Sequence, residues 1–348
     1  MATTTGSTIR ELLGMINRNS SGMAVIVDAS QRPVRTVTDG DIRRAILAGA
    51  ALDIPIGDLP EYFPSQNAVT VELGMSDKDM LALMHERCVQ QLPVLDEEGR
   101  LTAVVTMQDL VPEAASTLGA VVMAGGFGTR LRPLTSDVPK PMLPIGDRPL
   151  LERIVSQLRD SGIREVSLTT HYLPEIIESH FGDGSQFGVN INYVNEETPL
   201  GTAGALRLLS SPTYPLLVIN GDILTNVDFR RMKEFHEEHD ADLTLAVRPH
   251  ETQIPYGVVE TDGALLTSLV EKPTVTHFVN AGIYLLGEHA FDHIGVDGRL
   301  DMTQLVDALL ADGKRVATFP LTEYWIDIGH ISDYEQAQTD FANGVIAL

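Results

Sequence analysis

A chain of 348 residues with 25 Lys and Arg against 48 Asp and Glu has a formal net charge of -23, which argues against a general nucleic-acid-binding protein, since that needs a basic surface. Because the sequence has no uncharged apolar run of the ~20 residues that a membrane helix needs, and no apolar signal segment in MATTTGSTIR, we expect a cytoplasmic globular protein that binds no membrane. The single cysteine, Cys88, excludes a disulfide within the chain and a cysteine metal cluster, and the length allows one large or two smaller domains.

The first third of the sequence contains an internal repeat. The segments 24-AVIVDASQRPVRTVTDGDI-42 and 92-LPVLDEEGRLTAVVTMQDL-110 each predict a strand, a turn, a second strand and a helix that begins at Thr-x-x-Asp. Amphipathic helices are predicted before each copy, in IRELLGMIN and KDMLALMHER. A single duplication of this size indicates two similar units packed together, since a solenoid needs three or more repeats.

The Thr-x-x-Asp pairs of the repeat are Thr38 with Asp41 and Thr106 with Asp109. A Thr at a strand-to-helix junction caps the helix, and an Asp three residues later completes a capping box, so each pair can be purely structural. The same two side chains face one side of the helix and can also hold a ribose diol by hydrogen bonds. The residues alone leave both explanations open.

The duplicated segments TVTDGDI and VVTMQDL resemble a tandem pair of CBS motifs, the module that senses adenosyl ligands. The resemblance implies a regulatory α+β module over residues 1–117, with copies at about 1–57 and 58–115, and ribose contacts from the Thr and Asp of each pair. The second copy is the weaker match because Pro112 shortens its helix. Since CBS pairs associate in twos, the resemblance also implies a homo-oligomer.

An apolar run at 119-GAVVMAGG-126 is typical of a buried parallel strand that ends in a glycine loop. Gly125, Gly126 and Gly128 lack Cβ atoms, so successive backbone N–H groups can approach an anion closely. The loop is not a dinucleotide fingerprint, because Leu131 stands where a third glycine is needed, and it is not a Walker A loop. A turn without a ligand explains a bare glycine loop equally well.

Two cations follow this loop. Arg130 comes directly after it, and Lys140 stands between Pro139 and Pro141. The prolines fix φ and remove backbone donors, so Lys140 is expected on a stiff, non-helical segment from which it is displayed. Glycine loop, arginine and lysine together predict a polyphosphate cradle, whose cations offset the repulsion between a nucleoside triphosphate and an acidic protein.

From residue 118 onward, short apolar strands alternate with amphipathic helices. One helix is expected over 150–158 before the strand 165-EVSLTT-170, and another near TAGALRLL before the strand 215-PLLVING-221. This succession predicts a Rossmann-like, three-layer α/β domain over residues 118–348 with a mostly parallel mixed sheet. In such sheets ligands bind beyond the carboxyl ends of the strands.

Asp222 and Asp327 both fall at such a position, since each follows a short apolar segment and stands beside a glycine. Two carboxylates together with substrate phosphates and waters suit Mg²⁺, which prefers oxygen ligands. Each Asp taken alone is equally well explained as a turn residue or a helix cap.

The segment GGFGTRLRPLTSDVPKPMLPIGDRPLL resembles the signature of the sugar-nucleotide pyrophosphorylases, also called nucleotidylyltransferases. The resemblance implies that Arg130 holds the triphosphate, that Lys140 reaches the α-phosphate, and that Asp222 and Asp327 hold the catalytic metal. The segments NEETPLGTAGAL, EKP and VNAGIYLL match further landmarks of this family. The nucleotide-binding residues that it implies are Ala124, Gly125, Gly126, Gly128, Thr129, Gly201 and Thr202.

For the sugar phosphate, the same resemblance implies a site made by Glu271, Lys272, Asn280 and Gly282. In that site Glu271 accepts hydrogen bonds from the sugar hydroxyls, and Lys272 neutralises the phosphate. The catalytic residues implied are Arg130, Lys140, Asp222 and Lys272.

These observations predict an enzyme that joins a nucleoside triphosphate and a hexose 1-phosphate, giving a nucleotide sugar and pyrophosphate. The combination with a CBS pair resembles the CBS-linked guanylyltransferases, so GTP with glucosamine 1-phosphate or mannose 1-phosphate is expected, regulated by a nucleotide at the CBS module. Two alternatives remain open: a thymidylyl- or uridylyltransferase for glucose 1-phosphate, and a non-catalytic protein that senses nucleotides.

Overall fold

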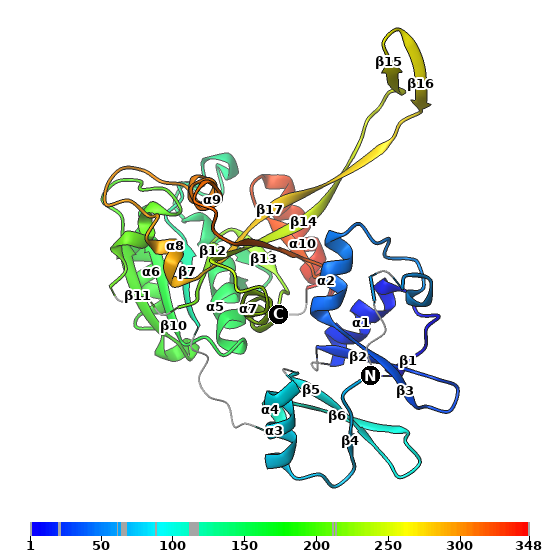
Figure 1. Ribbon diagram of the computed structural model, residues 1–348. Helices are drawn as coiled ribbons and strands as arrows, with labels where there is room; N and C mark the ends of the chain where they lie inside the picture. The colour runs from blue at the N-terminus through cyan, green and yellow to red at the C-terminus, as the bar shows by residue number, and fades with distance from the viewer. Residues whose placement is uncertain are drawn as a thin grey trace. The chain divides into compact units, whose positions relative to one another are not determined.

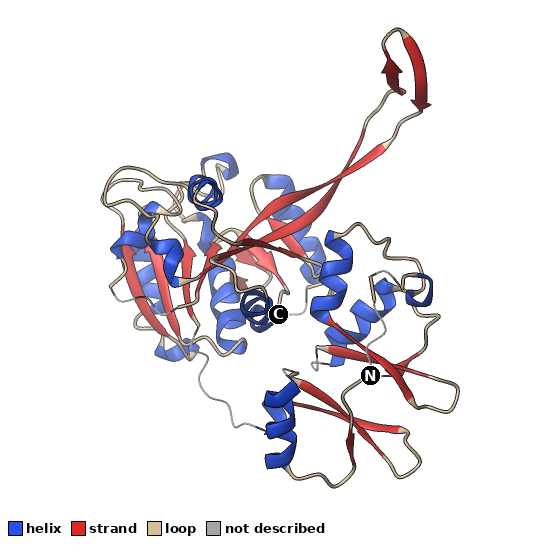
Figure 2. Ribbon diagram, viewed as in Figure 1, coloured by secondary structure: helices blue, strands red, loops and turns tan. Residues whose placement is uncertain are grey.

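The computed structural model describes residues 2–19, 22–60, 62–63, 68–87, 89–110, 118–210, 212 and 214–346 (Figures 1 and 2). The chain divides into two compact units, Met1–Ala115 and Ser116–Leu348. Cys88 and Pro112, on which two sequence-based expectations rest, lie outside the described residues. Within the described ranges, no helix is long and apolar enough to cross a membrane.

The first unit contains two three-stranded sheets with the same strand order. In each, a short first strand runs parallel to the middle strand, and the third strand is antiparallel to it. The strands are β1 (Ala2–Thr3), β2 (Met23–Val27), β3 (Pro33–Thr38), β4 (Val71–Glu72), β5 (Gln91–Leu95) and β6 (Leu101–Thr106). The two sheets therefore follow the two segments of the internal repeat.

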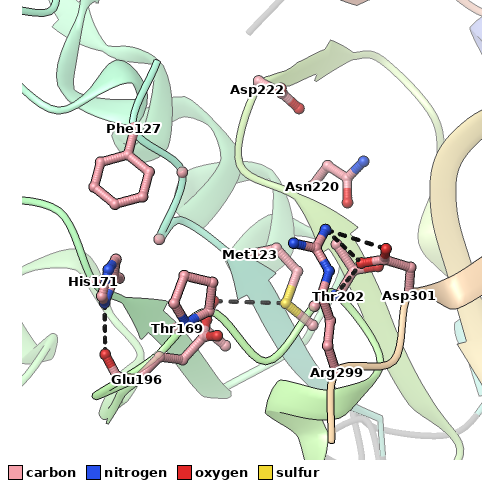
Figure 3. Close-up of a pocket in the computed structure, with 14 residues that line it drawn as sticks. Met123, Phe127, Thr169, His171, Glu196, Thr202, Asn220, Asp222, Arg299 and Asp301 are labelled. Atoms are coloured by element: carbon pink, nitrogen blue, oxygen red, sulfur yellow. Dashed lines mark hydrogen bonds and ion pairs between the residues drawn. The ribbon is translucent and has the colours of Figure 1, made fainter. Parts of the chain in front are cut away.

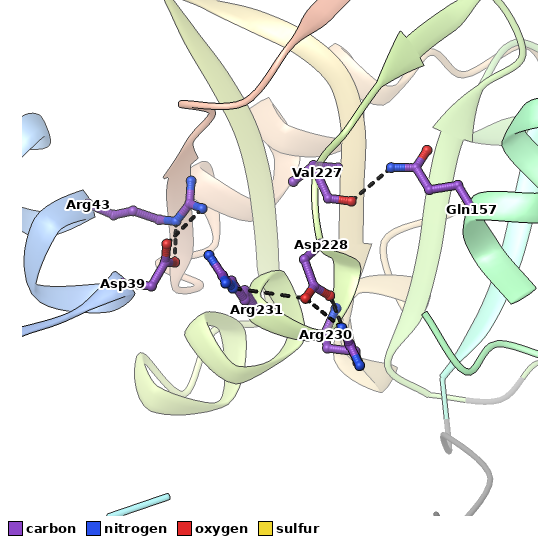
Figure 4. A network of polar contacts seen from close by, with 7 residues as sticks. All are labelled: Asp39, Arg43, Gln157, Val227, Asp228, Arg230 and Arg231. Carbon is purple, nitrogen blue, oxygen red and sulfur yellow. Dashed lines mark hydrogen bonds and ion pairs between the residues drawn. The ribbon is translucent and has the colours of Figure 1, made fainter. Parts of the chain in front are cut away.

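Helices flank each of these sheets as the repeat predicts. They are α1 (Ile9–Asn19), α2 (Asp39–Leu47), η1 (Ile56–Asp58), α3 (Asp77–Arg87) and α4 (Met107–Leu110). The apolar residues of α1 recur at helical spacing and are buried at Ile9, Leu12 and Ile16, so this face packs on the first sheet. Arg43 of α2 is fully buried and pairs with Asp39 at 2.5 Å (Figure 4).

The second unit is built on a seven-stranded sheet with the order β11-β10-β7-β12-β17-β14-β18. Neighbouring strands from β11 to β12 are parallel, β17 is antiparallel to both of its neighbours, and β14 and β18 are parallel. The prediction of a mostly parallel mixed sheet is confirmed. The strands are β7 (Gly119–Met123), β10 (Glu165–Thr170), β11 (Asn190–Asn195), β12 (Leu216–Asn220), β14 (Leu243–Gln253), β17 (Thr274–Leu286) and β18 (Val316–Pro320).

The helices of this unit are α5 (Leu150–Asp160), α6 (Pro174–Phe181), α7 (Phe229–Glu238), α8 (Glu288–Phe291), α9 (Met302–Ala311) and α10 (Ile331–Ala342). The apolar face expected over 150–158 is buried. Leu305 of α9 packs with Val121 and Val218 of the sheet in one core cluster. Asp228 caps α7 by accepting from the Arg230 amide at 3.0 Å, and Gln157 of α5 donates to the Val227 carbonyl (Figure 4).

Several short elements of this unit lie outside the seven-stranded sheet. They are η2 (Thr129–Leu131), η3 (Lys140–Met142), β8 (Pro144–Ile145), β9 (Arg148–Pro149), η4 (Ser185–Phe187), η5 (Gly204–Leu208), β13 (Ile223–Thr225) and β19 (Trp325–Asp327). The expectation of an α-helix near TAGALRLL is wrong, because this segment forms only the short 3₁₀ helix η5. The amides of Ala203 and Gly204 both donate to the Leu300 carbonyl, which fixes the segment from outside.

Strands β14 and β17 continue beyond the sheet as a two-stranded ribbon that ends in a hairpin of β15 (Val258–Asp262) and β16 (Leu265–Val270). Figure 1 shows this arm, in yellow, projecting from the body of the unit. We call residues 248–280 the arm. The hydrophobic pattern of the sequence did not predict it.

Candidate active site

The glycine loop after β7 is fixed by its neighbours. Gly128 has φ 60°, and a Cβ there would lie 3.0 Å from Thr135 Cγ2 and 3.1 Å from Lys140 Cβ, so only glycine fits without strain. The Thr135 hydroxyl donates to the Gly128 carbonyl at 2.8 Å. A Cβ at Gly126 would meet nothing within 4 Å. The loop is thus anchored at one glycine and open at the other, where a ligand can approach the backbone.

Lys140 begins η3 directly after Pro139, on the stiff segment that the flanking prolines predict. Its side chain is only 10% exposed and forms an ion pair with Asp222. Lys140 is therefore less exposed to solvent than the sequence led us to expect. Because Asp222 holds it, the ammonium group lies beside the carboxyl ends of the strands rather than in bulk solvent.

Asp222 and Asp327 are brought together by a small ladder of β13 and β19. Ile223 is paired with Asp327 in register, and the Ile328 amide donates to the Asp222 carbonyl at 3.0 Å. Gly221 lets the chain pass close to β7, since a Cβ there would lie 2.7 Å from the Met123 carbonyl oxygen. Asp222 therefore stands directly before β13 and Asp327 at the end of β19, so the ladder brings the two carboxylates close together.

The carboxylates repel one another. Partial desolvation, and then the charge of Asp222, raises the pKa of Asp327, although the charges of Lys140 and Arg130 act to lower it. A Cβ at Gly329 would lie 3.7 Å from both Arg130 Nη1 and Asp327 Oδ1, so both groups lie close to Gly329. A cation bound between the two carboxylates would relieve this repulsion.

The donor atoms of this cluster fit a divalent cation. Asp222 Oδ1 is buried and has no hydrogen-bond partner in the described part of the chain, while Oδ2 faces Lys140. A buried, unpartnered carboxylate oxygen calls for a ligand. The described residues contain no group of three or more His, Cys, Asp or Glu side chains arranged for a metal, so phosphates and waters would supply the remaining oxygen ligands, as is usual for Mg²⁺.

A cavity of about 300 Å³ lies at the carboxyl ends of the parallel strands (Figure 3). Five of the predicted site residues line it: Gly125, Gly126, Gly201, Thr202 and Asp222. The other lining residues are Met123, Phe127, Thr169, His171, Glu196, Pro199, Asn220, Arg299 and Asp301. Of the remaining predicted residues, Ala124 is buried behind the loop, and Thr129 and Arg130 lie in η2 after it.

His171 and Glu196 form one wall of the cavity, and sequence reasoning missed both. His171 directly follows β10, and Glu196 directly follows β11, so their positions at strand ends carried a signal for a ligand site. The Nδ1 of His171 lies 2.6 Å from the Glu196 carbonyl, and Glu196 Oε2 accepts from the Leu200 amide at 2.9 Å. The ring of Phe127 packs edge-on against His171 at 5.2 Å.

The opposite wall joins the loop at residues 199–202 to the start of α9. Gly201 has φ 82°, and a Cβ there would lie 2.6 Å from Asp301 Oδ1. The Thr202 hydroxyl accepts from the Met302 amide at 2.9 Å, so Thr202 caps α9 as well as lining the cavity. Arg299 pairs with Asp301 at 3.2 Å.

The predicted sugar-binding residues are divided between two places. Gly282 lies against the cavity, since a Cβ there would be 2.7 Å from Nδ2 of Asn220. Asn280 donates to the Tyr284 hydroxyl at 2.7 Å and accepts from the Gly282 amide at 2.8 Å. Glu271 and Lys272 lie on the arm between β16 and β17 and do not line the cavity.

The Thr-x-x-Asp pairs of the first unit form capping boxes. Thr38 Oγ1 accepts from the Asp41 amide at 3.1 Å, and Asp41 Oδ2 accepts from the Thr38 amide at 2.9 Å. Thr106 and Asp109 make the same two bonds at 3.2 and 2.8 Å. The structural explanation thus holds in both copies, and ribose binding stays a prediction.

Two family models match the chain. The model described as nucleotidyl transferase matches residues 119–344, and the model described as CBS domain matches residues 56–115. These matches confirm the resemblance to the nucleotidylyltransferases and, over residues 56–115, the resemblance to a CBS motif, whereas the first copy of the pair stays a prediction.

Among curated relatives, the mannose-1-phosphate guanylyltransferase of Mycobacterium tuberculosis is 36% identical over 67% of this chain and 67% of its own length. The mannose-1-phosphate guanyltransferase of Schizosaccharomyces pombe is 35% identical over 62% of each chain. A crystal structure of HddC from Yersinia pseudotuberculosis is 28% identical, with a TM-score of 0.51, over 64% of this chain and 99% of that one. The same protein complexed with GMP-PN gives a TM-score of 0.50 and 28% identity.

Proposed function

Since the chain belongs to the nucleotidyl transferase family over residues 119–344, we propose that it joins GTP and a hexose 1-phosphate to give a GDP-hexose and pyrophosphate. The observation that carries the proposal is the cluster of Arg130, Lys140, Asp222 and Asp327 beside the cavity. Two cations and two carboxylates gathered beside the carboxyl ends of the parallel strands are what phosphoryl chemistry with a bound cation needs.

In this proposal the cavity receives the nucleoside and the open glycine loop receives the phosphates. A volume of about 300 Å³ is within the range of small-ligand sites. The backbone at Gly125 and Gly126 contributes N–H groups toward the phosphates. Gly125 leaves little room for a side chain, because a Cβ there would lie 3.3 Å from Glu196 Oε1 and 3.3 Å from His171 Cβ.

In this reaction the protein forms no covalent bond with the substrates. An oxygen of the hexose 1-phosphate attacks the α-phosphorus, and the bond from that phosphorus to the bridging oxygen breaks, so that the electron pair leaves with pyrophosphate. The attacking oxygen is already ionised, so no general base is needed. Lys140 leaves its ion pair with Asp222 and binds the α-phosphate, and Arg130 offsets the charge of the triphosphate. Catalysis therefore comes from the positioning of the substrates and from charge neutralisation.

A bound Mg²⁺ would supply positive charge that offsets the charge of the phosphates. Asp222 and Asp327 are the residues that would hold it, through the unpartnered Oδ1 of Asp222 and the carboxylate of Asp327. Until the phosphates arrive, the other oxygen of Asp222 holds Lys140 in place.

The names of the relatives support guanine as the base. Two relatives are mannose-1-phosphate guanylyltransferases, and a structural neighbour is complexed with GMP-PN. Mannose 1-phosphate and glucosamine 1-phosphate are therefore the first acceptors to test. The CBS match at residues 56–115 supports a regulatory nucleotide in the first unit.

A screen of pyrophosphate release tests the proposal. The four common nucleoside triphosphates are each combined with mannose, glucosamine, glucose and N-acetylglucosamine 1-phosphates in the presence of Mg²⁺. We expect release with GTP and either mannose or glucosamine 1-phosphate, and none after removal of Mg²⁺ with EDTA. Release of pyrophosphate only with dTTP or UTP would show that the base is thymine or uracil and not guanine. Nucleotide binding without pyrophosphate release from any pair would favour a protein that only senses nucleotides.

A further inference from the structure

The hairpin of β8 and β9 follows Lys140 closely along the chain. η3 begins at Lys140, the Leu143 amide closes it by donating to the Lys140 carbonyl at 3.1 Å, and β8 begins at Pro144. Pro139, Pro141 and Pro144 each fix their own φ, so the path from the lysine to the hairpin contains few freely rotating bonds. The position of the hairpin therefore sets the position of the Lys140 backbone.

The ladder of this hairpin is too short to make it rigid. Pro144 is paired with Pro149 and Ile145 with Arg148, and neither proline has an N–H group to donate. An isolated two-stranded hairpin is marginally stable in water even with a longer ladder. Contacts with other elements must therefore fix its position.

Two side chains of α10 supply such contacts. The Pro144 carbonyl accepts from the Tyr334 hydroxyl and from Nε2 of Gln338, both at 2.7 Å. The Gly146 amide donates to Oε1 of Gln338 at 3.0 Å, so one side chain bonds the backbone on both sides of Ile145. Nε2 of Gln338 also donates to the Tyr334 hydroxyl at 2.9 Å. The two side chains therefore bind the hairpin backbone as one connected group.

The tip of the hairpin packs on the same helix. Gly146 has φ 63°, and a Cβ there would collide with the ring of Phe341, so the ring and the hairpin backbone are in close contact. The guanidinium of Arg153, from α5, lies 4.1 Å from the centroid of this ring and donates to the Ile145 carbonyl at 2.8 Å. It also donates to Asp147 at 2.7 Å. Because the Arg153 side chain is only 4% exposed, water competes little for these bonds.

The beginning of α10 is tied to the two carboxylates of the site. Asp327 ends β19, and α10 follows it after a short turn. In this turn the Ile328 amide donates to the Asp222 carbonyl at 3.0 Å, and the Gly329 amide donates to the Asp327 carbonyl at 2.9 Å. An α-helix of 12 residues is a stiff element about 18 Å long. α10 therefore joins the strand that carries Asp327 to the hairpin that follows Lys140.

We propose that Gln338 is a positioning residue for Lys140. Together with Tyr334 it fixes the hairpin, and the hairpin holds the lysine backbone at a constant distance from the carboxylate pair. The inference rests on the proposed function for what Lys140 does at the α-phosphate. When Lys140 leaves Asp222 for the phosphate, the ion pair no longer holds it, and the contact between α10 and the hairpin keeps its backbone in place. A displacement of about 1 Å at a reacting group can cost up to ~100-fold in rate, so loss of this contact should lower turnover.

Steady-state kinetics of two glutamine variants of the same helix test the proposal. Gln338→Ala removes the bonds to the hairpin, whereas Gln336→Ala removes a bond of 2.7 Å to Asp340 that does not involve the hairpin. We expect Gln338→Ala to lower kcat about tenfold with KM for both substrates within about twofold, since the residue contacts neither substrate. Gln336→Ala should leave both constants unchanged. In a Lys140→Ala background, Gln338→Ala should lower kcat by less than about twofold, because the side chain that it positions is absent.

Two kinetic outcomes would overturn the proposal. If Gln338→Ala lowers the melting temperature but keeps the wild-type kcat, the residue only stabilises the fold. If Gln338→Ala causes the same loss of kcat with and without Lys140, the residue does not act through the lysine.

Lysine labelling tests the positioning without any enzyme activity. The Lys140 side chain is 10% exposed in its pair with Asp222, so a brief treatment with acetic anhydride, followed by mass spectrometry, should modify it more slowly than Lys314, which is 32% exposed. In Gln338→Ala the labelling of Lys140 should rise at least about threefold through local opening. Labelling of Lys314 should stay the same, which shows that the whole fold has not opened, and Gln336→Ala should label like wild type. Unchanged labelling of Lys140 in Gln338→Ala would refute the positioning role.

If no nucleotide and sugar phosphate react but Gln338→Ala exposes Lys140 to labelling, the proposed function fails and the positioning of Lys140 by α10 stands. If pyrophosphate is released but Gln338→Ala keeps the wild-type kcat and the wild-type labelling, the proposed function stands and the positioning role fails. The two readouts therefore separate the two hypotheses.

Discussion

Lys140 forms an ion pair with Asp222 across a separation of 82 positions in the sequence. The lysine side chain is 10% exposed and the aspartate side chain 25% exposed, so water screens the pair only in part. The pair keeps the ammonium group at the strand ends before any phosphate arrives. It also makes Lys140 part of the fold as well as of the proposed chemistry.

Replacement of Lys140 by Ala should therefore change both turnover and stability. We expect turnover to fall by ~10²–10³, as for the loss of one electrostatic contact in a transition state. The melting temperature should also fall, because Asp222 and Asp327 are left without their cation. Mg²⁺ should restore part of that loss in the variant, since a divalent cation replaces the missing charge.

The matched control is Lys314→Ala, which removes a more exposed lysine that lies 4.0 Å from Asp312. It should leave turnover and melting temperature nearly unchanged. If Mg²⁺ raised the melting temperatures of wild type and Lys140→Ala equally, the idea that Lys140 and Mg²⁺ both bind the Asp222 carboxylate would be contradicted.

Asp327→Asn should nearly abolish turnover and slightly stabilise the metal-free fold. The pKa of Asp327 is raised by desolvation and by the charge of Asp222, so the folded protein holds this proton more tightly than the unfolded chain. That contribution is present below the ordinary Asp pKa of ~4 and is lost as pH rises. Because the residue is exposed, solvent weakens the effect, and we expect a gain of about 1–2 °C at pH 7.

Thermal melts of wild type and Asp327→Asn in EDTA, from about pH 4 to pH 7, measure this difference. The gap between the two proteins should widen as pH rises. A gap that stays constant, or one that narrows, would show that the Asp327 carboxylate does not strain the metal-free site. Asp312→Asn, at an exposed surface ion pair, is the control.

Two glycines of the same loop should respond differently to Ala. At Gly128 the positive φ and the contacts of 3.0 and 3.1 Å with Thr135 and Lys140 predict a destabilisation of about 1–3 kcal/mol. At Gly126 a Cβ meets nothing within 4 Å, so stability should change by less than about 0.5 kcal/mol. Its methyl group would instead stand where the phosphates approach, and GTP affinity should fall about tenfold.

Denaturant unfolding and calorimetric titration with GTP separate the two effects. If Gly126→Ala binds GTP as tightly as wild type, the loop backbone does not contact the nucleotide. Gly298→Ala at another open glycine, which has a positive φ of 80°, shows how much backbone strain alone contributes to stability.

The positions of Asp222 and Asp327 relative to strands explain why the sequence could predict that they lie together. Asp222 comes just after β12, at the carboxyl end of the parallel strands. Asp327 is the last residue of β19, and the antiparallel pairing of β19 with β13 brings it beside Asp222. His171 and Glu196 occupy positions equivalent to that of Asp222 and could have been found in the same way. The helix expected near TAGALRLL failed because contacts with Leu300, distant in sequence, override local helix propensity.

The arm could not be predicted for a different reason. Leu265, Leu266 and Leu269 give β16 the apolar composition of a buried strand, yet all three are exposed. A hydrophobic pattern predicts that a side chain is buried, but it does not predict whether the same chain or another chain buries it. For the same reason Glu271 and Lys272 could be assigned a role from their motif but not a location.

Asp41→Ala tests whether the capping box of the first CBS copy also binds a nucleotide. Asp41 accepts from the Thr38 amide and hydroxyl and pairs with Arg44 at 2.6 Å, so its loss should cost ~1 kcal/mol of stability. Asp79→Ala removes a similar contact, from Ser76 to Asp79 at 2.7 Å, outside the Thr-x-x-Asp repeat. Both variants should lose similar stability, but only Asp41→Ala should weaken AMP binding, by about tenfold or more.

Calorimetry with AMP on the full chain measures this binding, and the effect of AMP on the rate of pyrophosphate release should become smaller in the same variant. If wild type binds no AMP at millimolar concentration, or if both variants bind it equally well, the pair Thr38 and Asp41 only caps its helix and the first unit serves assembly.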